Sequence, residues 1–326
     1  MIKIYKTSEI SAELWERVVE GFNECFEAKT TVKKLQDFYT ATVFGYSYHA
    51  IDFDEDGTLR GYNSFVPYEY EHKDQILKVC LSGGTYVRKQ FRKDVFIFMN
   101  LVNELFAHCK ADGFAFKVGV PNKNSFKYAV KINKAKIVGY LPYYVLPYKM
   151  LDYFNEPFLK LFNFIPVLFA WLLWGLSYII SLFYNPKAKK REVEMHVSDK
   201  FLGIRFGNEE RYVKCRKGNL LAYYRVYEEN RGKIAYIMDF RENGTKSLKS
   251  LLFAVSNIMK QHSEVTMISY IGTMTIFESI LFRLPDSKVP HPFPLTINVL
   301  DKKKLETDKL LSMDSWDFSL MNFDVR

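Results

Sequence analysis

The sequence has few cysteines and histidines, and neither residue type is grouped. Four cysteines and six histidines are scattered over 326 residues. The cysteines show no disulfide or zinc-ligand spacing, and the histidines never recur at the short intervals that metal sites use. These absences exclude a disulfide-stapled scaffold and a zinc module, and we expect no metal. Cys80 and Cys109 fall in apolar runs, which predicts buried free thiols.

The N-terminus, Met1–Tyr5, lacks the apolar run of a secretion signal. We therefore expect the protein to reside in the cytoplasm, with a peripheral position at the inner face of the cell membrane for the reasons given below.

Composition is that of a folded protein, with 48% hydrophobic and 25% charged residues. A formal net charge of +9 favours anionic partners, namely a nucleotide-bearing cofactor, an anionic membrane or nucleic acid. Nucleic acid ranks last because the cations are scattered and no RNA-binding or zinc-finger signature occurs.

Residue periodicity in the first half predicts a mixed sheet with helices on both sides. The expected elements are a helix at 11–38, strands at 46–53, 59–67 and 76–87, a helix at 94–111, a strand at 114–120, a helix at 122–134 and a strand at 137–146. The Asp56-Gly57 pair predicts a hairpin turn, and Gly83 with Gly84 predicts a bulge in the third strand. Asp94 is the expected N-cap of the second helix.

Several local strings in this order are similar to one known family. Gly84–Val87 resembles the end of a fourth strand that leads into a pyrophosphate loop, here Arg88–Lys93. Gly119–Ser125 resembles a fifth strand that runs into an Asn-bearing segment, and Val138–Tyr140 resembles a final aromatic strand. Residues 1–150 therefore resemble a GNAT (Gcn5-related N-acetyltransferase) domain, a fold that transfers an acyl group from acyl-coenzyme A to an amine.

The resemblance implies acetyl-CoA or another acyl-CoA as co-substrate and an amine as acceptor. It implies coenzyme contacts at the following positions: Val87, Arg88, Arg92, Lys93, Asp94, Val95 and Asn122. The resemblance also implies two catalytic residues. Glu69 is the candidate general base and Tyr128 the candidate general acid, because both lie near the positions that these roles have in the family. Alternative roles remain open for three of these residues. Tyr128 is also explained by packing, Glu69 by a place on a solvated hairpin, and Asn122 by capping of the helix that follows it.

The loop departs from the family pattern, in which glycines let backbone amides touch the pyrophosphate. With Arg92 aligned as the first residue, the branched Val95 and Ile97 stand where small residues are expected. Asp94 adds a negative charge at the same helix end, whereas Arg88 and Lys93 add cations that partly replace backbone contacts. A loop that no longer binds coenzyme is the alternative.

Residues 161–184 contain no charged side chain and are long enough to cross a membrane. The basic residues that follow, at 187–191, favour the same cytoplasmic side as the first half. An interfacial helix, a buried inter-domain helix and a true span all remain open. We expect residues 161–191 to contact an anionic membrane surface.

The second half repeats the pattern of the first. The expected elements are strands at 212–215, 220–227 and 233–240, a helix at 245–262, a strand at 265–270 and a helix at 277–282. No phosphate-loop string lies between Asp239 and Lys246, so this unit is expected to be degenerate. The aromatic tail from Trp316 is expected to dock on the fold.

These patterns predict an α/β (α+β) protein with two GNAT-like units, each a mixed, mostly antiparallel sheet flanked by helices. The expected domains are 1–150 for acyl-CoA binding, 151–194 as a hydrophobic and basic connection, and 195–326 as the degenerate unit. The leading hypothesis is an acyl-CoA-dependent N-acyltransferase whose acceptor is an amino sugar of a cell-surface glycan precursor. A catalytically degenerate binding protein and a FemAB-like aminoacyltransferase are the alternatives.

Overall fold

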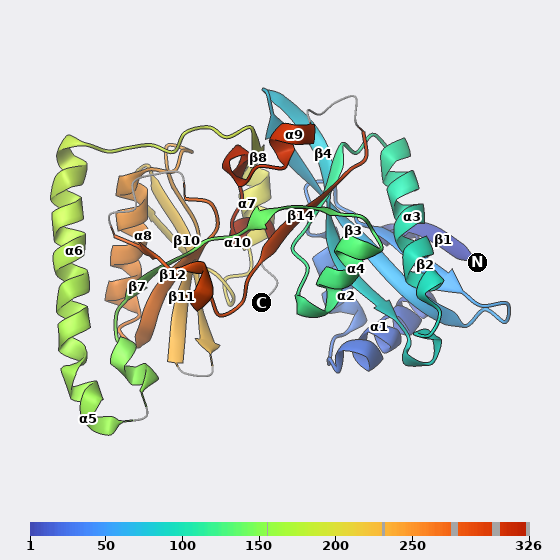
Figure 1. Ribbon diagram of the computed structural model, residues 1–326, viewed down its shortest axis with the longest axis horizontal. Helices are drawn as coiled ribbons and strands as arrows, with labels where there is room; N and C mark the ends of the chain where they lie inside the picture. The colour runs from blue at the N-terminus through green and yellow to red at the C-terminus, as the bar shows by residue number, and fades with distance from the viewer. Residues whose placement is uncertain (155, 230–231, 275–279, 302–306, 324–326) are drawn as a thin grey trace. The chain divides into compact units, whose positions relative to one another are not determined.

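The computed structural model describes residues 1–154, 156–229, 232–274, 280–301 and 307–323. Within it the chain forms two compact units, each assembled from three separate segments (Figure 1). Unit 1 contains 1–140, 192–205 and 293–315, and unit 2 contains 141–191, 206–292 and 316–326.

Unit 1 is built on a mixed sheet in the order β1-β2-β3-β4-β5-β14-β6, with β8 beside β3. Its strands are β1 (Ile2–Lys6), β2 (Tyr48–Phe53), β3 (Leu59–His72), β4 (Gln75–Val87), β5 (Phe116–Gly119), β6 (Lys136–Tyr140), β8 (Val193–Met195) and β14 (Pro294–Val299). Every neighbouring pair is antiparallel except β4 and β5, which run parallel. A parallel pair needs a crossover, and helix α3 provides it.

Helices cover both faces of this sheet. They are α1 (Ala12–Phe26), α2 (Val32–Thr40), α3 (Val95–Ala111) and α4 (Lys123–Lys131). Side chains of β3 alternate between the faces, so that Tyr62 and Val66 pack with α1 and α2 whereas Phe65 packs with α3. The α/β class that was predicted from the sequence is therefore confirmed.

Two predicted elements of unit 1 are each divided in the structure. The segment predicted as one helix at 11–38 breaks after Phe26, because Glu27 adopts a left-handed φ of 51° and Thr31 caps a new helix. The predicted strand at 137–146 is two strands, β6 and β7 (Tyr143–Pro147), which belong to different units. Pro142 lies between them and supplies no amide hydrogen to a ladder.

The β3–β4 hairpin is longer than predicted, and its predicted bulge is confirmed. Lys73 and Asp74 both have positive φ, so they form a tight two-residue turn without glycine. Along the ladder, Asn63 pairs with Thr85 and Phe65 with Ser82, so that Gly83 and Gly84 of β4 together oppose the single residue Ser64 of β3. The bulge begins two residues after Leu81, the last residue of β4 that pairs with β5.

Unit 2 repeats the same strand pattern, in the order β9-β10-β11-β12-β7-β13. Its strands are β9 (Val213–Lys217), β10 (Leu220–Glu229), β11 (Gly232–Glu242), β12 (Val265–Ile271), β7 and β13 (Phe282–Arg283), and a short β15 (Trp316–Asp317) follows. The one parallel pair within this order is β11–β12, crossed over by α8 (Leu248–Gln261). Of the helix predicted at 277–282, residues 277–279 lie outside the described residues, and the described remainder is not helical because Phe282 begins β13.

Each sheet is completed by a strand from a distant part of the chain. In unit 1, β14 (Pro294–Val299) inserts between β5 and β6, although β6 ends as far back along the chain as Tyr140. In unit 2, β7 inserts between β12 and β13, although it directly follows unit 1. β14 and β7 occupy equivalent positions in the two sheets. The chain therefore supplies this strand of each sheet from a segment that is distant in sequence from the rest of that sheet.

The remaining helices are short, apart from α6. They are α5 (Pro157–Lys160), α6 (Phe164–Phe183), α7 (Asp199–Phe206), α9 (Thr307–Leu310) and α10 (Leu320–Phe323), and neither β8 nor α7 was predicted. Figure 1 shows α6 running alongside α8 in unit 2. The aromatic tail docks as predicted, because Trp316 and Phe318 are fully buried.

Close packing of α3 on β3 depends on one glycine. A Cβ at Gly61 would lie 2.9 Å from both Ile97 Cγ2 and Leu101 Cδ1. Ile97 therefore occupies the space that a side chain on β3 would need.

We predict that Gly61→Ala lowers the free energy of unfolding by about 1–3 kcal/mol, because two branched side chains must shift in a packed core. Urea denaturation measures this. Gly175→Ala on α6 is the control, since a Cβ there meets nothing within 4 Å. Ile97→Ala removes the Cγ2 methyl that this Cβ would meet, so Gly61→Ala should cost less stability in the Ile97→Ala background than in the unmodified chain; an equal cost in both backgrounds would show that Ile97 does not set the helix position.

Candidate active site

The sheet of unit 1 opens where β4 and β5 separate. Their parallel ladder pairs Val79 with Phe116, Cys80 with Lys117 and Leu81 with Val118, and goes no further. β4 continues to Val87, whereas β5 ends at Gly119. Backbone groups of β4 beyond Leu81 therefore face an opening rather than a neighbouring strand.

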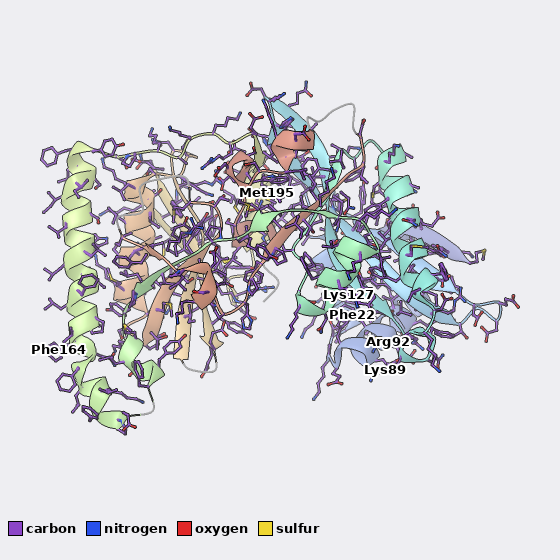
Figure 2. All side chains as sticks on the ribbon, viewed as in Figure 1. Phe22, Lys89, Arg92, Lys127, Phe164 and Met195 are labelled. Atoms are coloured by element: carbon purple, nitrogen blue, oxygen red, sulfur yellow. The ribbon has the colours of Figure 1, made fainter. Side chains whose placement is uncertain are left out.

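A basic loop follows the open end of β4 (Figure 2). Arg88 is already used within the protein, since its Nη2 lies 2.7 Å from Glu20 Oε2 on α1 and its Nε 3.7 Å from Glu24. Arg92 Nε donates to the carbonyl of Val87 at 3.1 Å, which folds the side chain back over the strand end. Figure 2 shows Lys89 and Arg92 on this loop and Lys127 on α4.

Helix α3 begins directly after this loop, with Asp94 as its N-cap as predicted. Phe96 N donates to Asp94 Oδ1 at 2.9 Å. Among the described residues, the amides of Val95 and Ile97 have no recorded acceptor beyond the helix, so two donors of this helix end stay available to a ligand. Of the two branched residues that were expected to crowd a phosphate, Val95 is 53% exposed and Ile97 is buried against Gly61.

The bulge on β4 is held by a buried polar network on the α1 side of the sheet. Tyr39 OH accepts from Ser64 Oγ at 2.8 Å and from the amide of Gly84 at 3.3 Å, and Ser64 Oγ also lies 3.1 Å from the carbonyl of Gly84. Tyr62 OH and His49 Nδ1 are 2.7 Å apart. Burial lowers the pKa of His49 to about 3, so the imidazole is neutral and serves to position its neighbours.

A buried lysine also lies at the opening, and the sequence analysis missed it. Lys117 is 4% exposed on β5, opposite Cys80 of β4 in the ladder. A Cβ at Gly119 would lie 2.9 Å from Lys117 Nζ, so the side chain extends along the strand toward the open end. Lysine inside a run of buried strand residues, Phe114–Val118, was the signal that could have revealed it.

Comparison with known proteins by sequence finds no matching family and no matching curated protein. Comparison of folds does find similar structures. A GCN5-related N-acetyltransferase from Kribbella flavida has a TM-score of 0.60 at 10% identity, and the match covers 92% of this chain and 71% of that one. Its counterpart from Anabaena variabilis ATCC 29413 has a TM-score of 0.58 at 9% identity, covering 92% and 73%.

A third similar structure is a conserved protein of Enterococcus faecalis V583, described as a probable N-acyltransferase. Its TM-score is 0.57 at 10% identity, and the match covers 92% of this chain and 73% of that one. These matches extend over both units. The fold is GNAT-like. At this level of identity the likeness concerns the fold, so the chemistry of this GNAT-like chain has to be argued from its own residues.

The two predicted catalytic residues lie at different places in this GNAT-like unit, Glu69 before the β4–β5 ladder and Tyr128 beside Phe98 in the first turn of α3. Glu69 pairs with Lys78 in the first half of β4, before the ladder with β5 begins, and its carbonyl accepts from the amide of His196. Tyr128 is 47% exposed on α4, where its ring meets Phe98 at 5.6 Å. The structure therefore does not bring Glu69 and Tyr128 together, and their catalytic roles stay predictions.

Of the predicted coenzyme contacts, all but one lie at the end of β4, on the loop or at the start of α3. Asn122 is the exception, and its side chain caps α4 by accepting from the amides of Asn124 and Ser125 at 3.0 Å each. Lys93 lies beside Arg92 and is exposed. The carbonyl of Val87 is taken by Arg92 and by the Cys25 thiol.

The corresponding helix end in unit 2 is closed by the protein itself. Leu248 N donates to the carbonyl of Pro186 at 3.0 Å, and Lys249 N donates to Asn185 Oδ1 at 3.0 Å. Ser250 N donates to Ser247 Oγ. Because its first three amides all have partners, α8 leaves none of them for a phosphate.

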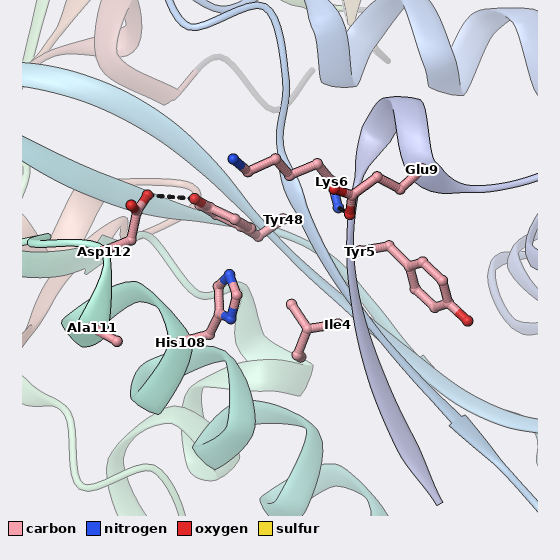
Figure 3. Close-up of a pocket in the computed structure, with 8 residues that line it drawn as sticks. All are labelled: Ile4, Tyr5, Lys6, Glu9, Tyr48, His108, Ala111 and Asp112. Atoms are coloured by element: carbon pink, nitrogen blue, oxygen red, sulfur yellow. Dashed lines mark hydrogen bonds between the residues drawn. The ribbon is translucent and has the colours of Figure 1, made fainter.

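A separate pocket of about 420 Å³ lies at the opposite end of α3 (Figure 3). Of its two carboxylates, Glu9 and Asp112, Asp112 is hydrogen-bonded to Tyr48 OH, and the imidazole of His108 packs on the Tyr48 ring at 4.9 Å. Asp112 follows the last turn of α3, roughly 25 Å from its first turn at 1.5 Å per residue. This pocket is therefore not part of the candidate active site.

Proposed function

We propose that unit 1 binds acyl-CoA in the opening between β4 and β5 and transfers the acyl group to an amine. The observation that carries this proposal is the end of the parallel ladder at Leu81 and Val118, followed by a basic loop and a helix start with available amides. A phosphate-bearing ligand fits such a helix end because backbone N–H groups and the helix dipole favour an anion there.

In this proposal the pyrophosphate lies at the start of α3, and the cations nearest to it are those of Lys89, Arg92 and Lys93. Arg88 instead organises the loop through Glu20 and Glu24. Asp94 weakens the site electrostatically, because a carboxylate that caps the helix also repels the phosphates. Binding is therefore expected in the micromolar range rather than tighter.

The pantetheine arm would run along β4 toward the bulge at Gly83 and Gly84. Backbone groups at the bulge, which Tyr39 and Ser64 hold in place, are suited to orient the thioester. Attack by the neutral acceptor amine on the thioester carbonyl forms the amide and releases the coenzyme thiol. An amino sugar carried by a cell-surface glycan precursor remains the acceptor that we propose, and the apolar surface of α6 supports an acceptor held at a membrane.

We predict that calorimetric titration of acetyl-CoA into the full chain detects micromolar binding, and that Arg92→Glu weakens it at least 10-fold by reversing one charge at the phosphate site. Lys110→Glu, in the last turn of the same helix, is the matched control and should bind as the unmodified chain does. Asp94→Ser keeps a capping oxygen but removes the repelling charge, so it should bind several-fold tighter.

Absence of binding by the folded unmodified chain and by Asp94→Ser would favour the alternative, a GNAT-like binding protein without turnover. Tight, salt-sensitive binding of tRNA with no response to acetyl-CoA would instead favour aminoacyl transfer.

A further inference from the structure

Lys117 carries a charge that nothing in the described part of the chain neutralises. Among those residues its Nζ makes no ion pair or hydrogen bond, and Thr296 Oγ1 lies close to the same point above Gly119. The nearest titratable neighbour is Cys80, and burial raises the pKa of that thiol well above its usual range, so it remains a neutral thiol. An unpaired buried ammonium is costly, and burial lowers the pKa of Lys117 to about 8.

The position of Lys117 indicates the side from which an anion could approach and neutralise its charge. Its Cα is paired with Cys80, one residue before the last rung of the β4–β5 ladder, and its side chain passes over Gly119 toward the open end. From that rung to Val87, β4 runs about 20 Å at ~3.3 Å per residue. A coenzyme whose phosphates lie at the loop would therefore present its acyl end, the end farthest from the phosphates, to Lys117.

We infer that Lys117 binds the terminal carboxylate of a dicarboxylic acyl group, such as succinyl, carried by CoA. This inference rests on the proposed function and names its acyl substrate class. A charge-assisted hydrogen bond between carboxylate and ammonium supplies the missing partner, and acetyl offers no such group. Gly119 leaves room for this arrangement, because a Cβ there would lie 2.9 Å from Nζ and the ammonium would have to shift.

Calorimetry with succinyl-CoA and acetyl-CoA on the full chain tests this inference. Succinyl-CoA should bind roughly 10-fold or more tightly than acetyl-CoA, and this ratio of affinities should fall to about 1 in Lys117→Met.

Binding of succinyl-CoA near pH 8 should also take up protons, because a carboxylate raises the pKa of the lysine; titration in buffers of different ionisation enthalpy measures this. Lys110→Met is the control and should leave the ratio unchanged. Equal affinities in the unmodified chain, or a ratio that Lys117→Met does not alter, would overturn it.

Two further readouts separate this inference from the proposed function. Lys117→Met should raise or maintain the melting temperature, since it removes an unpaired buried charge; a large fall would assign the lysine a structural role instead. Free succinate, followed by NMR titration of the Lys117 Nζ, tests the carboxylate site without coenzyme. A response to succinate without acyl-CoA binding would refute only the proposed function, and no response to either ligand would refute both.

A second, independent observation concerns α6, whose inner face packs on the core of unit 2 and whose outer face is apolar and exposed. The inner face carries the small, buried residues Ala170, Ser177 and Ser181, and Trp174 Nε1 donates to the carbonyl of Leu252 on α8 at 2.9 Å. The outer residues are large, apolar and between 43% and 88% exposed: Phe164, Ile165, Leu168, Phe169, Leu172, Leu176, Ile179, Ile180, Leu182 and Phe183. Figure 2 shows Phe164 at one end of this outer row.

The chemistry of this surface distinguishes lipid from protein as its occupant. Residues 157–183 are long and apolar enough to cross a membrane, with a mean hydropathy of 1.9, yet the inner face is committed to α8. The outer row offers no charge and almost no hydrogen-bonding group, whereas protein interfaces form about one hydrogen bond per 100–200 Å². Exposed lysines stand at both ends, Lys160 before the helix and Lys187 and Lys189 after it.

We propose that the outer row of α6 lies on an anionic lipid bilayer, with its axis along the surface. Apolar side chains enter the acyl-chain boundary, and the terminal lysines contact anionic headgroups. The contacts of the inner face with α8 are kept, so the helix does not need to leave its unit.

Co-sedimentation of the full chain with phosphatidylcholine vesicles, with and without 30% phosphatidylglycerol, tests the proposal. Binding should be at least 10-fold stronger to the anionic vesicles and should be lost in Leu172→Glu/Leu176→Glu. Ile76→Glu, an equally exposed apolar position in unit 1, is the control and should bind normally. Circular dichroism checks that the double variant is folded.

Equal binding to both vesicle types would refute the role of the lysines. Absence of vesicle binding, together with a dimer in light scattering that the double variant abolishes, would show that a second copy covers the row instead.

Discussion

The site depends on one interruption of hydrogen bonding, the end of the β4–β5 ladder at Leu81 and Val118. A parallel pair that continued to Val87 would satisfy the backbone of β4 and leave no opening in the sheet. Instead, the Gly83–Gly84 bulge redirects β4, and buried hydroxyls of Tyr39 and Ser64 hold the bulge in place. The backbone groups of β4 that lack a partner strand reduce the stability of the fold. The large hydrophobic cores on the two faces of the sheet offset this loss.

Strand exchange gives each unit a sheet that its own continuous segment could not complete. β14 closes the gap between β5 and β6, and β7 does so between β12 and β13. Unit 2 retains the pattern of a strand, a helix and a parallel strand, but the chain at Asn185 and Pro186 occupies its helix start. The same architecture thus has an available helix end in unit 1 and a blocked one in unit 2.

Local signals were enough to predict the α/β class, most elements, the glycine bulge and the cap Asp94, because each depends on neighbouring residues. The strand exchange was not predictable, since β7 and β14 have ordinary strand sequences and only long-range pairing decides their sheet. The sequence suggested that Ile97 would crowd a bound phosphate. In the structure its side chain packs against Gly61 of β3, and the local sequence around Ile97 does not reveal that contact. The importance of Lys117 likewise follows from its depth and its neighbours rather than from any motif.

Hydrogen–deuterium exchange of the full chain, with and without acetyl-CoA, tests the central claim that the opening in unit 1 is the coenzyme site. Protection is predicted at residues 82–97, which cover the end of β4, the loop and the start of α3, and no change is predicted at residues 246–252 of unit 2. Unchanged exchange at 82–97 at saturating acetyl-CoA, or protection confined to the start of α8, would contradict this account.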